Sequence, residues 1–191
     1  MSVQTKGKLL EAAKRVFSER GYFNAHISHI IDEAGVARGT FYLYFKGKED
    51  IFRELLRGVV EELRKRIKTI DPSHDPAPQI IGNVASVIEF ALSDRELATI
   101  VLRRNCDPEL FGIIGDFFEE LIDLIKLSLD KGVALGLVRE CDTELLARAV
   151  VGALKEVILG LLEREDVDVV SVATELVELG LGGVWKKEAG R

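Results

Sequence analysis

The sequence predicts an all-α fold of about nine helices, in which an N-terminal three-helix segment precedes a larger helical body. Apolar residues recur at three- and four-residue steps along the whole chain, and no alternation with a period of two persists. All four prolines lie at breaks in this pattern, at Pro72, Pro76, Pro78 and Pro108. With 191 residues, 47% of them hydrophobic, the chain is long enough and apolar enough to bury a core.

The first four helices follow from these spacings. A stripe that starts at Leu9 and ends at Phe17 forms one face of the first helix, which Gly21 is expected to end. Short helices are expected at 27–34, closed by Gly35, and at 37–44. A long helix follows over 51–70, up to the linker 71–78.

Helix-start signals divide the rest of the chain. After a helix at 79–92, Ser93 and Glu96 form a predicted capping box for the next one. Asp107 followed by Pro108 predicts the start of a long helix through the segment 110–132. Asp142 is expected to cap a helix over 143–164, and Asp166 or Asp168 precedes the last.

Charge is unevenly distributed along the chain. The net charge is −6, yet residues 1–48 hold eight Lys/Arg and four acidic residues, whereas the remainder carries −10. This asymmetry suggests a basic module on an acidic body, with random scatter as the alternative. Two cysteines, early basic residues and no apolar run of membrane-spanning length predict a cytoplasmic protein with reduced thiols and no membrane partner.

The segment ISHIIDEAGVARGTFYLYF has the pattern of two short helices joined by a tight glycine turn, a helix-turn-helix. Four apolar residues are expected to face inward on its first helix: Ile27, Ile30, Ile31 and Ala34. Gly35 fits a turn that needs positive φ. Phe41 and Phe45, four residues apart, would form the buried face of the second helix.

The outward side of that second helix offers polar and aromatic groups of the kind that contact DNA. Arg38, Thr40, Leu43 and Tyr44 would face out, with Tyr42 at the flank, and Lys48 begins the next helix nearby. An aromatic core stripe is the simpler alternative. It accounts for Phe41 and Phe45 without needing the charged and hydroxyl groups beside them.

Residues 8–56 resemble the DNA-binding domain of the TetR/AcrR family of transcriptional regulators. The similarity is carried by AAKRVFSERGY, by IxxII with AGVARGTFYLYF, and by the K-E-D-I-F spacing. The resemblance implies a DNA-binding domain at 1–47 and a ligand-binding and dimerisation domain at 48–191. It implies that these residues contact operator DNA: Arg38, Thr40, Tyr42, Leu43, Tyr44 and Lys48. Arg38 and Leu43 would be the base readers.

The sequence departs from the family pattern at several helix starts. Hydroxyl residues are common in the family where this chain has Ala25 with His26, Ala37, and Gly47, and each loss would remove a cap of roughly 1 kcal/mol. His29 stands where the family often has an acid. Ser28, His26 or Asn24 could replace the first cap, and His26 and Ser28 are kept as candidate DNA contacts. His26 and His29 lack a third ligand, so no metal site is expected.

The resemblance also implies a homodimer through the two C-terminal helices. The expected interface residues are Val150, Leu154, Val157, Ile158, Leu161, Val172, Leu176 and Leu179. An internal core pair is the alternative for these apolar residues. A large apolar surface left on a monomer usually marks an interface.

A small-molecule effector, apolar or amphipathic, is the remaining implied partner, and no cofactor is expected. The candidate effector contacts are Leu63, Phe90, Asn105, Phe117, Phe118 and Leu121, with Asn83 as a further polar group expected to orient a ligand. The resemblance therefore implies a homodimeric repressor that an effector releases from its operator.

Two other functions are alternatives to a DNA-binding repressor. An enzyme is disfavoured because the chain has no Gly-rich phosphate loop, no nucleophile elbow and no paired Cys/His metal spacing. A helical protein-interaction module that docks through 37–50 remains the alternative.

Overall fold

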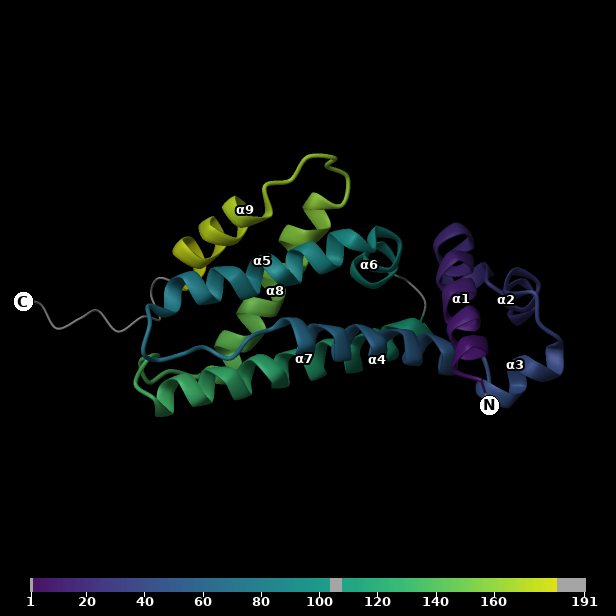
Figure 1. Ribbon diagram of the computed structural model, residues 1–191, viewed down its shortest axis with the longest axis horizontal. Helices are drawn as coiled ribbons and strands as arrows, with labels where there is room; N and C mark the ends of the chain where they lie inside the picture. The colour runs from purple at the N-terminus through teal and green to yellow at the C-terminus, as the bar shows by residue number, and fades with distance from the viewer. Residues whose placement is uncertain (1, 104–107, 182–191) are drawn as a thin grey trace, which may run out of the picture. The chain divides into compact units, whose positions relative to one another are not determined.

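The computed structural model describes residues 2–103 and 108–181, and it confirms the all-α prediction (Figure 1). Those residues form nine α-helices and contain no β-strand. In chain order the helices are α1 (Val3–Asn24), α2 (Ile27–Ala34), α3 (Arg38–Tyr44), α4 (Lys48–Arg66), α5 (Pro76–Ser93), α6 (Arg95–Leu102), α7 (Pro108–Ala134), α8 (Thr143–Leu161) and α9 (Val169–Leu176), which continues into a π-helical segment, η1 (Val177–Leu181).

The chain forms two compact units. The first comprises Met1–Glu62 and Asp94–Phe117, and the second comprises Leu63–Ser93 and Phe118–Arg191. The boundary therefore passes through α4 and α7 and falls between α5 and α6. No helix of the described residues combines the length and the apolar character that a membrane crossing needs.

In the first unit, α1 packs against both α2 and α6. Its buried face carries Leu9, Val16 and Phe17, as the sequence predicts, and the Phe17 ring meets the Phe52 ring of α4 edge-on at 5.6 Å between centroids. Gly21 has a non-helical backbone, with φ of 70° and ψ of 158°, so the first helical stretch breaks there as expected, and a further helical turn continues α1 to Asn24.

In the second unit, α5 packs against α8 and α9, as Figure 1 also shows. The side chain of Asn83, on α5, holds the chain that follows α4: its Oδ1 accepts from the Lys68 amide at 2.9 Å and its Nδ2 donates to the Lys68 carbonyl at 2.8 Å. Both ends of this amide are therefore bound to backbone. Its expected role in orienting a ligand has no support here.

The helix starts divide into correct and incorrect predictions. Asp142 caps α8 as expected, and its Oδ1 accepts from the Leu145 amide at 3.0 Å. Asp168 caps α9, and its Oδ1 accepts from the Ser171 amide at 3.0 Å. Pro108 begins α7, and Asp107 lies outside the described residues. The Ser93 capping box is wrong: Ser93 ends α5, and its hydroxyl donates to the Phe90 carbonyl at 2.7 Å.

Asp94 is the actual cap of α6, and it also binds α1. Its Oδ1 accepts from the Leu97 amide at 3.2 Å, and its Oδ2 accepts from the Lys14 ammonium at 2.9 Å. Burial acts to lower the pKa of Lys14, but the hydrogen bond and the charge of Asp94, with a contribution from Glu11, raise it above its usual value. One carboxylate therefore joins two helices of the first unit.

We predict that Asp94→Ala lowers the free energy of unfolding by about 1–2 kcal/mol, because it removes both a cap and a partly buried ion pair. Asp94→Asn keeps a capping oxygen and should cost less than half as much. Denaturant unfolding followed by circular dichroism measures both. Lys8→Met is the control, since Lys8 is an exposed cation on α1, the helix that also carries Lys14. Equal losses for Asp94→Ala and Lys8→Met would contradict the assignment.

Candidate nucleic-acid interface

Burial of one face of each helix positions α2 and α3. Ile30 and Ile31 are buried on α2, whereas Ile27, which the sequence placed inward, is only half-buried. On α3 and just after it, Phe41 and Phe45 are buried with ring centroids 5.8 Å apart. This confirms that the two phenylalanines form the inner face of the aromatic run.

The turn between the two helices is made by Gly35, which adopts left-handed φ and ψ of 63° and 38°. Its amide donates to the Asp32 carbonyl at 3.2 Å, and the Val36 amide donates to the Ile31 carbonyl at 3.3 Å. A side chain at this φ would be strained, which is why glycine suits the position. The pattern is a helix-turn-helix.

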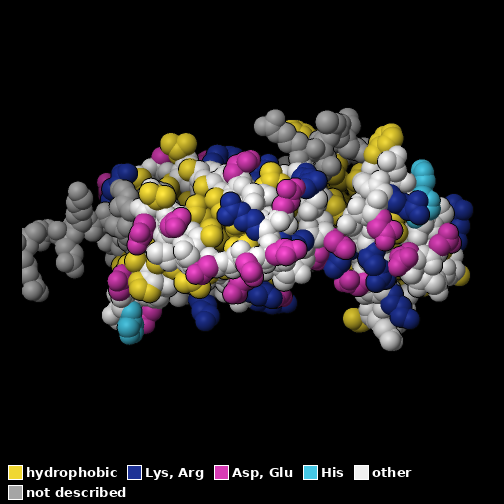
Figure 2. Space-filling model, turned by 90° about the horizontal axis from the view of Figure 1, so that it is seen from above, with side chains coloured by type: hydrophobic (Ala, Val, Ile, Leu, Met, Phe, Trp, Pro, Cys, Tyr) yellow, Lys and Arg dark blue, Asp and Glu magenta, His cyan; other side chains and the backbone are white. Residues whose placement is uncertain are grey.

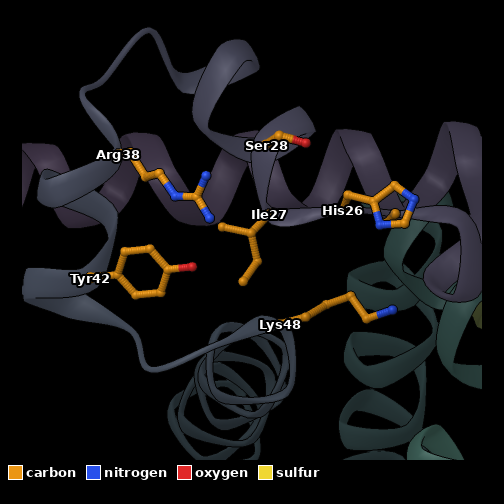
Figure 3. A pocket seen from close by; sticks show the side chains of 7 residues that line it. His26, Ile27, Ser28, Arg38, Tyr42 and Lys48 are labelled. Carbon is orange, nitrogen blue, oxygen red and sulfur yellow. The ribbon is translucent and has the colours of Figure 1, made fainter.

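An open groove lies on the outer side of these helices (Figure 3). Its lining comes from the start of α2, from α3 and from the first residue of α4: Ala25, His26, Ile27, Ser28, Arg38, Tyr42 and Lys48. In Figure 3 the Arg38 guanidinium and the Tyr42 hydroxyl both point toward Ile27. The lining contains two permanent cations and no carboxylate.

Lys48 is held in place by the end of α1. Its ammonium donates to the Tyr22 carbonyl at 2.8 Å and lies 4.2 Å from the centre of the Tyr22 ring. An ammonium has three donors, so this hydrogen bond leaves others for a further acceptor. Lys48 is thus a fixed cation rather than a free surface lysine.

The hydroxyl of Tyr44 is used within the chain. It accepts from the Ser2 amide at 2.9 Å and donates to the Ser2 carbonyl at 3.2 Å. These bonds tie the start of α1 to the end of α3. A phosphate contact by Tyr44 therefore has to coexist with this link or replace it, and it remains a prediction.

The other predicted contacts on α3 differ in exposure. Leu43 is 64% exposed and Tyr42 is 47% exposed, while Thr40 is half-buried. Arg38 is exposed and has no ion-pair partner within residues 2–103 and 108–181. The groove gathers five of the eight predicted DNA contacts, and Thr40, Leu43 and Tyr44 lie outside its lining.

The sequence reasoning missed two groove residues, Ala25 and Ile27. Ala25 stands where the family has a hydroxyl, and that position signalled its place at the start of α2. Ile27 was assigned to the core because it fits the inward spacing. Its position at the first residue of α2 is the signal that it can face outward.

Histidines replace the usual cap at the start of α2. His26 is the N-cap residue, and its backbone amide donates to Nδ1 of His29 at 3.2 Å. His29 thus does the work of the acid that is common at the third helical position in a capping box. Ala37 gives α3 no side-chain cap, and neither helix has an acid in its first turn.

The predicted effector contacts are scattered over both units. Leu63 and Phe117 are buried, and Phe90, Phe118 and Leu121 are half-buried, while Asn105 lies outside the described residues. Phe118 and Leu121 pack against a cluster of Ile122, Ala147 and Val151. Among the residues that the structure describes, no group of three or more His, Cys, Asp or Glu side chains could hold a metal.

The predicted interface residues fall into three classes of exposure. Ile158 and Leu161 are buried in the protomer, and Leu179 is 87% exposed. The others are half-buried: Val150, Leu154, Val157, Val172 and Leu176. The exposed residues of α8 are instead Glu144, Leu145, Arg148, Ala149, Gly152, Ala153, Glu156 and Gly160.

Comparison with known proteins matches residues 9–55 to the model described as bacterial regulatory proteins, tetR family. An uncharacterised HTH-type transcriptional regulator of Bacillus subtilis, YdgC, is 30% identical over 191 residues, which cover 97% of this chain and 95% of YdgC. The fatty acid degradation regulator FadR of Bacillus halodurans superposes with a TM-score of 0.81 at 26% identity, covering 96% and 97% of the two chains. FadR of Bacillus subtilis, solved with stearoyl-CoA, superposes with a TM-score of 0.76 at 26% identity, covering 93% and 98%.

Proposed function

Since the chain belongs to the tetR family of bacterial transcriptional regulators, we propose that it is a homodimeric repressor whose groove along α2 and α3 binds operator DNA. The observation that carries the proposal is the groove itself, which places Arg38 and Lys48 on one face with no carboxylate in the lining. Phosphates favour such a surface. We assign DNA binding to residues 1–47 together with Lys48. Effector binding and dimerisation are assigned to the rest of 48–191. We place the protein in the cytoplasm.

Within the groove, we assign different tasks to its two cations. Arg38 is exposed, lies at the first position of α3 and can offer a planar fork of donors to guanine O6 and N7. Lys48 is fixed by Tyr22 and presents a point charge, which suits a phosphate oxygen. Leu43, largely exposed on α3, can pack against a thymine methyl group.

We predict that Arg38→Ala weakens binding to the operator by about 1–3 kcal/mol and relaxes the preference at one base pair. Lys48→Ala should weaken operator and random DNA alike, and it should flatten the dependence of log K on log[salt] by about one unit. Fluorescence anisotropy with duplexes selected from genomic DNA tests both. Lys68→Ala, an exposed cation of the second unit, should leave the slope unchanged. Equal losses for Arg38→Ala on operator and random DNA would contradict the division of tasks.

We propose that the dimer interface is the exposed side of α8, together with the half-buried Val150 and Val157 beside it. The exposed Leu179 would add to this interface. Among the described residues, nothing lies within 4 Å of where a Cβ would stand on Gly152 or Gly160, so no described contact requires glycine there. Glycine within a helix is destabilising by roughly 0.5–1 kcal/mol relative to alanine, and it permits close approach of another backbone. A second copy of α8 would supply that close neighbour. Two-fold symmetry would then present two α3 helices to successive major grooves about 34 Å apart.

We predict that Ala153→Arg converts the dimer to a monomer at micromolar concentration, because the side chain would enter the contact between two copies of α8. Sedimentation equilibrium measures the change. Ala153 is exposed in the protomer, so folding should be unaffected. Leu127→Arg on α7, a similar exchange at an exposed apolar site, should remain dimeric. A wild-type monomer, or a dimeric Ala153→Arg variant, would contradict this interface.

For the effector we propose a long-chain acyl-CoA, which joins an apolar tail to anionic phosphates. A cation lies over two of the rings that are predicted to contact the effector. The Arg66 guanidinium lies 5.0 Å from the centre of the Phe90 ring, and the Lys155 ammonium lies 5.0 Å from the centre of the Phe118 ring. Such pairs offer an apolar face and a positive charge together. The stearoyl-CoA bound to FadR of Bacillus subtilis adds support from a relative of similar fold.

We predict that stearoyl-CoA binds to the protein. Saturating operator DNA should lower the affinity for stearoyl-CoA by the same factor by which stearoyl-CoA lowers the affinity for operator DNA, since coupling is reciprocal. A 100-fold preference for the DNA-free state corresponds to about 2.7 kcal/mol per site. Calorimetry with and without operator measures the factor, and free CoA is the control for the headgroup. Tight binding with unchanged affinity in the presence of DNA would contradict release by this effector.

A further inference from the structure

The ammonium of Lys48 is held in the groove by groups that carry no net charge. It donates to the Tyr22 carbonyl at 2.8 Å and lies 4.2 Å from the centre of the Tyr22 ring. Lys14 of α1 is held differently, because its ammonium binds the carboxylate of Asp94 at 2.9 Å. A carboxylate offsets the charge of the lysine that it binds. A carbonyl and a ring face attract the ammonium but leave its charge available to a phosphate.

Carboxylates surround Lys48 in the sequence, so neutral partners are not the default. Glu49 and Asp50 follow it in the first turn of α4. Figure 2 shows Lys and Arg side chains interspersed with Asp and Glu side chains over the visible face. Yet Lys48 forms no ion pair with a carboxylate within residues 2–103 and 108–181. The Asp50 carboxylate instead accepts from the Lys46 amide at 2.9 Å.

The core of the first unit fixes Tyr22 in place. Its ring is 4% exposed and lies 5.3 Å, between centroids, from the rings of both Phe17 and Phe52. The non-helical backbone of Gly21 precedes it, and its carbonyl lies in the last turn of α1, where carbonyls lack partners within the helix. That carbonyl accepts from the Ala25 amide at 3.3 Å and from the lysine. The acceptor for the ammonium is therefore in position before DNA binds.

We propose that Tyr22 is a positioning residue for DNA binding, which presents the Lys48 ammonium to a backbone phosphate with its charge uncompensated. This proposal rests on the groove being the DNA surface. The carbonyl takes one of three ammonium donors and leaves the others for phosphate oxygens. A lysine that is already ordered also loses less side-chain freedom when it binds. In Figure 3 the Lys48 ammonium points away from Arg38 and Tyr42, which fits separate contacts for the two cations of the groove.

The test is a double-mutant cycle, measured by fluorescence anisotropy on a selected operator duplex and on random DNA. Tyr22→Leu removes the ring face and should weaken both duplexes alike by about fivefold, the size of one cation–π contact. In the Lys48→Ala background the same exchange should change affinity by less than about twofold, because no ammonium is left to position. In the Arg38→Ala background it should keep its full effect.

Two control variants separate positioning from stability. Tyr22→Phe keeps both the ring and the carbonyl, so it should bind DNA as the wild type does. Leu9→Ala removes a fully buried side chain far from Tyr22 along α1. It should destabilise the same unit while leaving the DNA affinity of the folded protein unchanged. Circular dichroism establishes that each variant is folded under the binding conditions.

A measurement on the wild-type protein makes the test independent of how any variant folds. Protons close to the face of an aromatic ring resonate upfield of their usual positions. The ε-methylene protons of Lys48, assigned by comparison with Lys48→Arg, should therefore resonate upfield of those of the exposed Lys8. Nuclear magnetic resonance of the DNA-free protein records the shift.

Equal losses from Tyr22→Leu in the wild-type and Lys48→Ala backgrounds would overturn the inference, because the ring would then act through the fold alone. Unshifted Lys48 methylene protons would overturn it as well. Failure to bind any selected duplex at any salt concentration would overturn the proposed function and this inference with it. Salt-dependent DNA binding with an additive cycle would leave the proposed function intact and remove only the role of Tyr22.

Discussion

Helices of seven and eight residues do not persist alone in water, so α3 and α2 depend on burial of their apolar faces against the rest of the first unit. Ile30 and Phe41 are fully buried, and Phe45 nearly so. The turn at Gly35 sets how the two helices meet. The same packing directs Arg38 and Tyr42 outward, next to the start of α2 and the fixed cation of Lys48. The groove is thus a consequence of the core beneath it.

Charge placement around that core is consistent with a polyanionic partner, although the whole chain is acidic. Helices α6, α8 and α9 each begin with an aspartate whose side chain caps the first turn. Helices α2 and α3 begin with His26 and Ala37 and have no acid in the first turn. An aspartate there would add roughly 1 kcal/mol of stability but would repel phosphate. The positive ends of these helices stay uncompensated on the side where DNA is proposed to bind.

The sequence could predict the features that depend on local spacing. The bounds of α2, the left-handed Gly35 and the burial of Phe41 and Phe45 all follow from periodicity and turn chemistry. What it could not predict depends on contacts between distant segments. Asp94 caps α6 because its other oxygen is held by Lys14 of α1, eighty residues away, so the neighbouring Ser93 was chosen wrongly. Likewise, Asn83 binds the Lys68 backbone and Tyr44 binds Ser2, and neither partner is visible from local sequence.

The central claim is that the groove along α2 and α3 is the DNA surface. Hydrogen exchange of the backbone amides, with and without a selected operator duplex, tests it most directly because it reports on every segment at once. The account predicts strong protection by DNA within residues 25–48 and much less across α8 and α9. Protection confined to α8 and α9, with residues 25–48 unchanged by bound DNA, would contradict it.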